Sequence, residues 1–318
     1  MSERFLVTGA HGCVGAWTVA RLVREGTPVV GFDLGEGPGR ASLLLDGEEL
    51  ARVPFVRGDV TRRDDLDRAL DEYEVTHVIH LAALQLPYCS ADPARGALVN
   101  VVGTVQVFDA VAARAGAVRG LAYASSIAVH GRSLYGAWKR ANEETAAVYW
   151  QDHRLASVGL RPALVYGVGR DRGITSSATT AMLAAARGRP YEIVHGGSHR
   201  FQYAPDVARC FVDAARAEVE GAKVLESGGR RHDMRDVVAA IEAAAPGARI
   251  TVTDVPLGAG GDGDRPSAEL QALIGPIEWT PLDDGVRETI ERFRALPQLE
   301  LPVDCALSRT QTAARIAP

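Results

Sequence analysis

The stretch TGAHGCVG, residues 8–15, lies between a short apolar run, RFLVTG, and an amphipathic segment at 14–25. A glycine triplet at this place predicts a strand that turns tightly into a helix. Gly9 permits the turn, Gly12 lets backbone approach a pyrophosphate, and Gly15 lets the helix pack closely on the sheet. The helix N-terminus would then face the phosphate charge. Alone, such a turn indicates a dinucleotide site only weakly, because any tight strand-to-helix turn favours glycine.

The next apolar run, PVVGFD, ends in Asp33. Its carboxylate is placed to accept hydrogen bonds from both hydroxyls of an adenosine ribose, and it would repel a 2′-phosphate. The sequence therefore favours NAD over NADP, a preference that Arg40 would weaken. The alternative interpretation of Asp33 is an ordinary acid at the start of a turn.

Outward from this turn, short apolar runs alternate with amphipathic segments. The expected helices are 64–73, 98–115 and 135–152, and the expected strands include THVIHLAA, GLAYASS and SVGLRPALVYG. This alternation predicts an α/β fold with a doubly wound parallel Rossmann sheet. After residue 167 the pattern is less regular, with helices at 177–187 and 205–217 and a glycine-rich surface loop at 258–267.

We expect two domains and a tail. The NAD-binding Rossmann domain comprises residues 1–166 and 202–228. A smaller C-terminal substrate-binding domain comprises residues 167–201 and 229–300, and the tail is 301–318.

Composition excludes several classes of protein. The net charge of −5 and the scattered basic residues argue against a nucleic-acid partner. No apolar stretch is long enough for a bilayer, so no membrane partner is expected. Four widely spaced cysteines and an N-terminus without signal-peptide zones predict a cytoplasmic protein. We expect no metal, because His77 and His80 alternate in facing and GDGD at 261–264 lacks the later acidic ligand of a calcium loop.

A phenol and an ammonium are predicted on one helix face, at Tyr135 and Lys139. A neighbouring cation and the positive nicotinamide ring would lower the pKa of the phenol and make it a usable base. Ser126, at the end of the preceding strand, could donate a hydrogen bond to the substrate oxygen. This spacing is common by chance on solvated helices, and its value comes from following the nucleotide motif.

With these residues in view, the chain resembles the extended short-chain dehydrogenases/reductases, also called the NAD-dependent epimerase/dehydratase family. The resemblance covers nearly the whole chain, and it rests on these pieces: TGAHGCVG, Asp33, GDV at 58–60, HLAA at 80–83, Asn100, SSIAVHG at 125–131, YGAWK, RPALVYG at 161–167 and RFQYAPDVA at 200–208.

The resemblance implies a catalytic triad of Ser126, Tyr135 and Lys139. The residues expected to bind NAD are Gly9, His11, Gly12, Cys13, Val14, Gly15, Asp33, Asp59, Val60, Leu81, Ala82, Ala83, Asn100, Tyr135 and Lys139. Those expected at the substrate are Ser125, Ser126, His130, Arg172 and Arg200. One departure is that only GRSL separates His130 from Tyr135, where typical members have a longer loop that walls the pocket.

Three functions stay open, and we rank dehydrogenation of a small polyol, sugar or sugar acid first. Nucleotide-sugar epimerisation is second. An epimerase must bind the large nucleotide diphosphate of its substrate, and the short loop before Tyr135 makes such binding less evident. A dinucleotide sensor without catalysis is third, since Tyr135 and Lys139 are both present. Dehydration is not expected, because Ile127 and Ala128 stand where dehydratases have an acid pair. The resemblance also implies a homodimer through helices 98–115 and 135–152.

Overall fold

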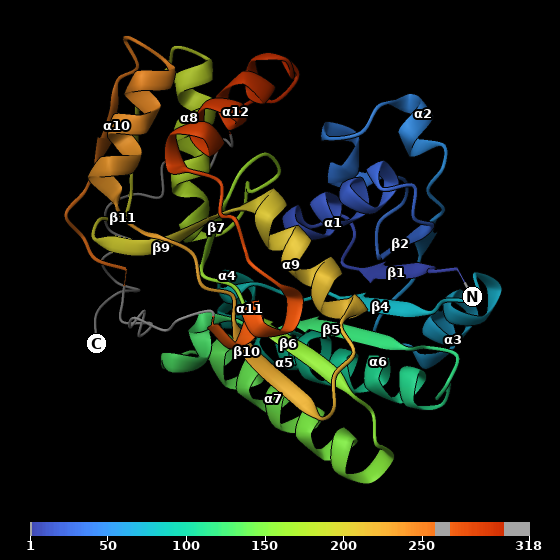
Figure 1. Ribbon diagram of the computed structural model, residues 1–318. Coiled ribbons are helices and arrows are strands. Elements are labelled where there is room, and N and C mark those ends of the chain that lie inside the picture. The colour runs from blue at the N-terminus through green and yellow to red at the C-terminus, as the bar shows by residue number, and fades with distance from the viewer. Residues whose placement is uncertain (1, 258–267, 302–318) are drawn as a thin grey trace.

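Seven parallel strands form the central sheet of the computed structural model, which describes residues 2–257 and 268–301. Across the sheet they run β10 (Ala222–Glu226), β6 (Ser157–Arg161), β5 (Gly120–Ala124), β4 (His77–His80), β1 (Phe5–Thr8), β2 (Val29–Asp33) and β3 (Phe55–Arg57). The strand order reverses between β1 and β4 at the middle of the sheet (Figure 1). Ligands of such sheets bind at this reversal, beyond the carboxyl ends of the strands. The predicted doubly wound sheet is confirmed.

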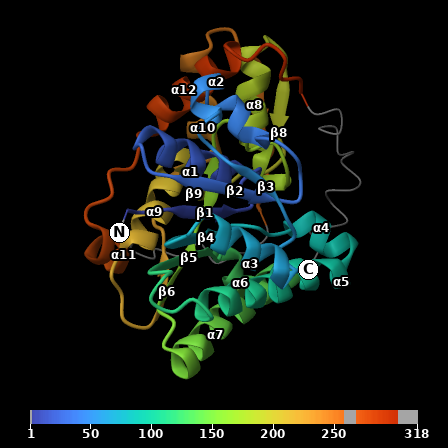
Figure 2. The ribbon, with the colours of Figure 1, turned by 90° about the vertical axis from the view of Figure 1, so that its right-hand side faces the viewer.

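Helices cover both faces of this sheet. On one face lie α1 (Cys13–Arg24) and α9 (Ala204–Arg216), and on the other lie α3 (Arg63–Glu72), α6 (Gly103–Ala112) and α7 (Leu134–His153) (Figures 1 and 2). The strands read as unbroken apolar runs because both of their faces are buried. Phe5 of β1 faces the core beneath α1, while its neighbour Leu6 faces the core beneath α6.

Shorter helices connect these elements. They are η1 (Gly39–Leu43), α2 (Gly47–Leu50), α4 (Leu86–Ala91), α5 (Pro93–Ala97), the π-helical η2 (Leu98–Val102), η3 (Ile127–His130) and η4 (Ile174–Ser176). The helix expected at 98–115 is therefore a π turn followed by α6, which ends at Ala112.

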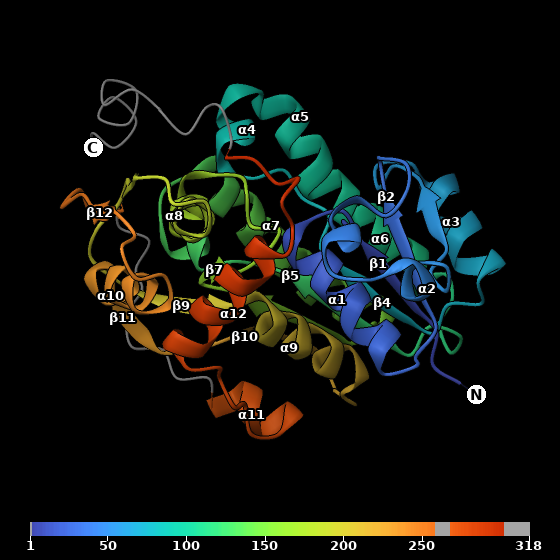
Figure 3. The ribbon, with the colours of Figure 1, turned by 90° about the horizontal axis from the view of Figure 1, so that it is seen from above.

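A smaller region lies beyond the carboxyl ends of the strands (Figure 3). One small sheet runs β11 (Arg231–Asp233), β9 (Ser198–Tyr203) and β7 (Leu164–Tyr166), and another pairs β12 (Ile250–Val252) with β8 (Tyr191–Ile193). The helices of this region are α8 (Ser177–Ala186), α10 (Met234–Ala244) and α12 (Leu282–Arg294). α12 packs on both α8 and α10, whereas α11 (Ala268–Ile274) packs on α9 and β10.

The expected strand SVGLRPALVYG is divided at Pro162. β6 stays in the central sheet, but β7 pairs with β9 in the small sheet. Proline has no N–H for a strand ladder, so the run breaks there and changes sheets. The domain boundary that we placed at residue 166 stays a proposal. β7 falls within the residues 1–166 assigned to the Rossmann domain, although it pairs with β9 in the small sheet. The loop expected at 258–267, including GDGD, and tail residues 302–318 lie outside the described residues.

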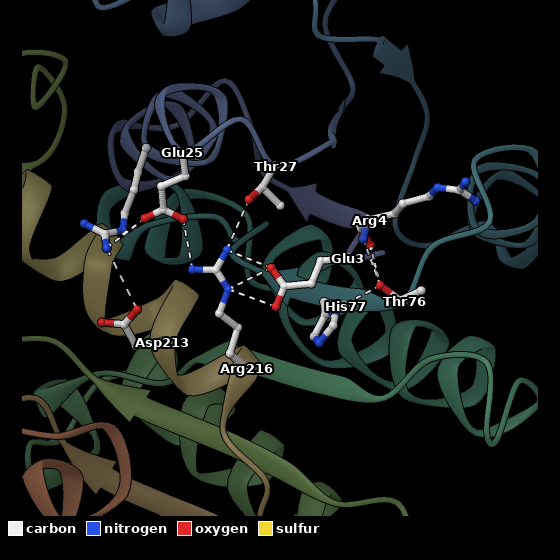
Figure 4. Close-up of polar contacts among 9 residues, drawn as sticks. Glu3, Arg4, Glu25, Thr27, Thr76, His77, Asp213 and Arg216 are labelled. Atoms are coloured by element: carbon white, nitrogen blue, oxygen red, sulfur yellow. Dashed lines mark hydrogen bonds and ion pairs between the residues drawn. The ribbon is translucent and has the colours of Figure 1, made fainter. Parts of the chain in front are cut away.

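Arg216 at the end of α9 connects this helix to residues near the amino ends of the strands (Figure 4). Its guanidinium donates to Glu3 at 2.8–3.1 Å, to Glu25 at 2.9 Å and to Thr27 at 3.3 Å. It also covers the ring of Phe5, 5.4 Å from the centroid. These contacts lie at the edge opposite the carboxyl ends of the strands, so they hold the framework and leave the crevice free.

The two strand histidines have structural contacts. His77 stacks on Phe5 with ring centroids 4.8 Å apart, and His80 bonds Thr8 at 2.7 Å and Thr104 at 3.1 Å. Within 2–257 and 268–301, no three His, Cys, Asp or Glu side chains gather as a metal site would require. In the same ranges no helix has the length and apolar character needed to cross a membrane.

Candidate active site

The glycine turn between β1 and α1 has no room for a side chain at Gly9 or Gly15. Gly9 has a φ of +71°, and a Cβ there would meet the Ala82 nitrogen at 2.7 Å. A Cβ on Gly15 would lie 2.2 Å from the Gly9 carbonyl oxygen. Gly12 caps α1 with no side-chain hydrogen bond, so the first amides of the helix, from Cys13 onward, have no side-chain cap. This turn fits a pyrophosphate, which would contact backbone only.

Asp33 lies beside this turn, where an adenosine ribose is expected. One of its oxygens accepts from the His11 amide at 3.0 Å and the other from the Leu34 amide at 2.8 Å. The His11 ring bonds the Gly37 carbonyl at 2.6 Å, which folds the loop after β2 over it. Both carboxylate oxygens have further lone pairs, so Asp33 can still accept from ribose hydroxyls.

The guanidinium of Arg40 already has hydrogen-bond and ion-pair partners within the chain. It donates to the His11 carbonyl at 2.7 Å and grips Asp171 with contacts of 2.6, 2.9 and 3.1 Å. Its guanidinium therefore neutralises Asp171 of the loop after β7, and it is not a free receptor for a 2′-phosphate. The weakening of the NAD preference that we expected from Arg40 is not supported by these contacts.

The segment 58–60 lies next to Asp33, whose carbonyl accepts from the Gly58 amide at 2.9 Å. The Asp59 carboxylate accepts from the Thr61 amide and hydroxyl at 2.9 and 2.8 Å, and Val60 is buried against Gly103 of α6. On the other side of β1, the loop 81–83 lines the turn, and the Leu81 amide bonds the Thr8 carbonyl at 3.1 Å. These segments border the expected cofactor crevice.

Asn100, expected at the cofactor, is held by the loop after β4. Its side chain is buried, accepts from the Leu84 amide at 2.7 Å and donates to the Leu84 carbonyl at 2.9 Å. Its own carbonyl accepts from Asn142 at 2.9 Å. Asn100 therefore shapes the loop after β4, and its contact with NAD stays a prediction.

Tyr135 and Lys139 lie on successive turns of α7. The Lys139 Nζ is 5.6 Å from the centroid of the Tyr135 ring and donates to the Ala124 carbonyl at 2.6 Å. Burial lowers the pKa of Lys139 to about 8, against the opposing effects of Cys89 and Glu143. Burial raises the pKa of Tyr135 to about 12, while Arg170 and a hydrogen bond with Ser126 act in the lowering direction.

The short connection before α7 has a local cause. Ser133 caps the helix by accepting from the Gly136 amide at 3.0 Å, and a Cβ on Gly136 would lie 2.2 Å from the Ala128 carbonyl oxygen. The helix therefore packs directly on η3. Ser126 caps η3 by accepting from the Ala128 amide at 3.1 Å, which fixes its hydroxyl near Tyr135.

Arg170 is a site residue that the sequence did not single out. Its side chain is half-buried and donates to the Thr175 hydroxyl at 2.6 Å, and its buried Nε has no hydrogen-bond partner among the described residues. Its charge acts on both Cys13, in the phosphate turn, and Tyr135. A half-buried guanidinium whose charge reaches both residues suits an anionic group. The only signal in the sequence was its position three residues after Gly167.

The residues expected at the substrate are divided. Ser125 is buried and donates to Glu143, and His130 bonds Glu226 at 2.9 Å, so both belong to an internal polar network. Arg172 is exposed on the loop after β7, and Arg200 is buried in β9. Only Ser126 of this group is placed against Tyr135.

Residues 5–226 match the family model described as the NAD dependent epimerase/dehydratase family. The chain belongs to this family. The resemblance inferred from the motifs is thereby confirmed. NAD is the family's cofactor, and the uncapped turn and Asp33 fit it.

Individual relatives extend the match beyond residue 226. A UDP-glucose 4-epimerase of Mycolicibacterium smegmatis is 32% identical over 317 residues, which span 92% of this chain and 98% of that protein. UDP-glucuronate 4-epimerase 2 of Arabidopsis thaliana is 30% identical over 253 residues, 71% of this chain, but the match covers only 56% of that protein. The crystal structure of a Thermus thermophilus UDP-glucose 4-epimerase in complex with NAD has a TM-score of 0.78 at 26% identity, over 92% of this chain and 99% of that one.

Proposed function

We propose that this chain is an NAD-dependent epimerase that inverts a hydroxyl-bearing carbon of a nucleotide sugar. The observation that carries the proposal is the near full-length match to a 4-epimerase, combined with a Tyr135–Ser126–Lys139 arrangement next to the phosphate turn. UDP-linked hexoses and hexuronates are the first substrates to test, because the relatives are named for them.

In the proposed reaction Tyr135 takes the proton from a sugar hydroxyl and later returns it to the same oxygen, after the configuration at the attached carbon has been inverted. NAD, which the glycine turn and Asp33 would hold, would supply reversible hydride chemistry at that carbon; hydride would return to the opposite face, so no net oxidation results. Ser126 orients the sugar oxygen, and the positive charges of Lys139 and Arg170 favour the phenolate form of Tyr135. The nicotinamide charge acts in the same direction as Arg170.

The ranking made from the sequence placed dehydrogenation of a small free substrate ahead of epimerisation. The relatives support the second of these interpretations better, since they are named as epimerases. Dehydration has no support, because Ile127 and Ala128 follow Ser126 and neither can protonate a leaving hydroxyl.

We also infer a homodimer through η2 with α6 and through α7. Trp138 and Tyr149 serve the subunit itself, since Trp138 packs against Gly96 and Tyr149 bonds Asp109. Four other apolar side chains of these helices are exposed: Leu98 (47%), Val102 (40%), Leu134 (44%) and Val148 (52%). A second copy would cover them.

The first experiment is to incubate the NAD-loaded protein with UDP-glucose or with UDP-glucuronate and to separate the products by anion-exchange chromatography. We expect the 4-epimer to form with no lasting absorbance of reduced nicotinamide, and Tyr135→Phe to abolish turnover while NAD stays bound. Stoichiometric NADH from a free polyol, sugar or sugar acid would instead establish a dehydrogenase. Bound NAD with no turnover of any of these compounds would favour the sensor.

A further inference from the structure

Lysine is rare in this chain. Of 35 lysines and arginines, two are lysines, Lys139 and Lys223. Lys223 is exposed on β10, whereas Lys139 is 3% exposed beneath Tyr135. Arginine stays charged at any accessible pH, but a buried lysine is charged only if its surroundings favour the ammonium. The charge of Lys139 therefore depends on its neighbours.

Glu143 lies one helical turn after Lys139, on the same face of α7. Its carboxylate is fixed by a fork from Arg161, with Nε to Oε1 at 2.8 Å and Nη2 to Oε2 at 2.6 Å. Ser125 donates to the same Oε1. Glu143 is thus held in one position, and the strand end that carries Ser125 and Ser126 is held with it.

Arg161 divides its donors between two carboxylates. Its third nitrogen, Nη1, donates to Glu226 at 3.1 Å, and His130 bonds the same Glu226 oxygen at 2.9 Å. The positive charge of Arg161 is therefore shared. From one helical turn away, Glu143 raises the pKa of the Lys139 amine, as Cys89 does more strongly, against the larger lowering effect of burial.

The other groups that face Lys139 come from three elements. His80 lies on β4, Cys89 on α4, and Tyr135 on α7, with Arg161 of β6 behind Glu143. His80 is buried and its pKa is lowered to about 3 by that burial, so it brings no positive charge at neutral pH. Among these described neighbours of Lys139, Glu143 is the residue with a carboxylate.

We propose that Glu143 is a positioning residue that acts through Lys139 and Ser125: it keeps the Lys139 ammonium charged at neutral pH and fixes the strand end that presents Ser126. The proposal rests on the proposed function only in assigning Tyr135 and Lys139 to the reaction. Its physical consequence is that without Glu143 the amine loses its proton at a lower pH. Tyr135 then lacks a neighbouring cation over part of the working range.

The test uses the full-length protein labelled with lysine enriched in ¹³C at Cε. Because there are two lysines, the spectrum has two signals, and the exposed Lys223 serves as an internal reference. We expect Lys139 to titrate near pH 8 in the wild type, and Glu143→Gln to move that midpoint down by about one pH unit. The alkaline limb of kcat should move down with it.

Glu226→Gln is the matched control. Its side chain is about as exposed as that of Glu143, 15% against 11%, and it bonds the same arginine. We expect it to leave the Lys139 midpoint in place. A merely structural role for Glu143 would change stability in both variants and leave both midpoints unmoved.

Should Glu143→Gln prevent folding, Glu143→Asp withdraws the carboxylate by one methylene and should lower the midpoint by a smaller amount. An unchanged midpoint in the folded Glu143 variant, or an equal shift in Glu226→Gln, overturns the proposal. The titration needs no substrate, so its failure is distinguishable from failure of the epimerase assignment.

Discussion

At the scale of single residues, Arg170 is the residue that the structure places near Tyr135 although the sequence did not indicate it. Its charge lowers the pKa of Tyr135, so Arg170→Met should raise that pKa and leave less phenolate at any given pH. We expect turnover at pH 7 to fall about tenfold or more and to recover partly as the pH rises. The pH dependence of kcat measures this effect, and NAD affinity by fluorescence measures any loss at the phosphate turn.

Arg172→Met is the comparison for Arg170→Met. Both residues lie in the loop after β7, but the sequence selected Arg172 for the substrate and the structure places it in solvent. A larger defect in Arg172→Met than in Arg170→Met would restore the choice made from the sequence.

The arrangement of the proposed reactive residues could be predicted from the sequence because its geometry is local. Tyr135 and Lys139 share a helix face by spacing alone, and Ser126 ends the strand before them. That Ser125 donates to Glu143 could not be predicted, since it depends on where the folded α7 places Glu143. Arg170 was missed because only the folded loop after β7 brings it to Tyr135.

At the scale of elements, the turn from β1 to α1 is fixed by contacts that leave no room for Cβ. Gly15→Ala would press a methyl group to within 2.2 Å of the Gly9 oxygen, and backbone cannot move aside as a flexible side chain can. We expect a loss of about 1–3 kcal/mol in the free energy of unfolding and weaker NAD binding. Urea denaturation with and without NAD measures both.

Gly47→Ala is the control for that substitution, because a Cβ at Gly47 in α2 would meet nothing within 4 Å. Equal destabilisation by the two substitutions would mean that the turn is not the sensitive element.

Among the elements, the central sheet and its helices were predictable because alternating apolar runs and amphipathic segments each have a local signature. The division of SVGLRPALVYG into two strands in different sheets was not predictable. A run of that composition suits one buried strand, and only the missing N–H of Pro162 hinted at the break. That β7 then joins β9, more than thirty residues later in the chain, follows from tertiary packing.

At the scale of the whole molecule, the framework and the site lie at opposite edges of the sheet. Arg216 ties α9 to Glu3 and Glu25 at the amino edge, while the polar network around Glu143 and Arg161 lies at the carboxyl edge. Strand order brings the ends of β5, β6 and β10 together there. Helix α7, which carries Tyr135 and Lys139, therefore has one face against this edge and another, with Leu134 and Val148, open to solvent.

That open face carries the prediction of a dimer. Leu134, Ala141 and Val148 recur at intervals of seven on α7, which places them on one stripe. Val148→Glu puts a charge on the inferred interface, where a second copy would have to bury it unpaired, so the dimer should dissociate. Sedimentation velocity at micromolar concentration measures this. Val255→Glu, at an exposed apolar residue outside these helices, should leave the mass unchanged.

A wild-type protein that sediments as a monomer would refute the dimer. Dissociation by both substitutions would place the interface elsewhere, because charge at a remote site should not open a contact built on α7.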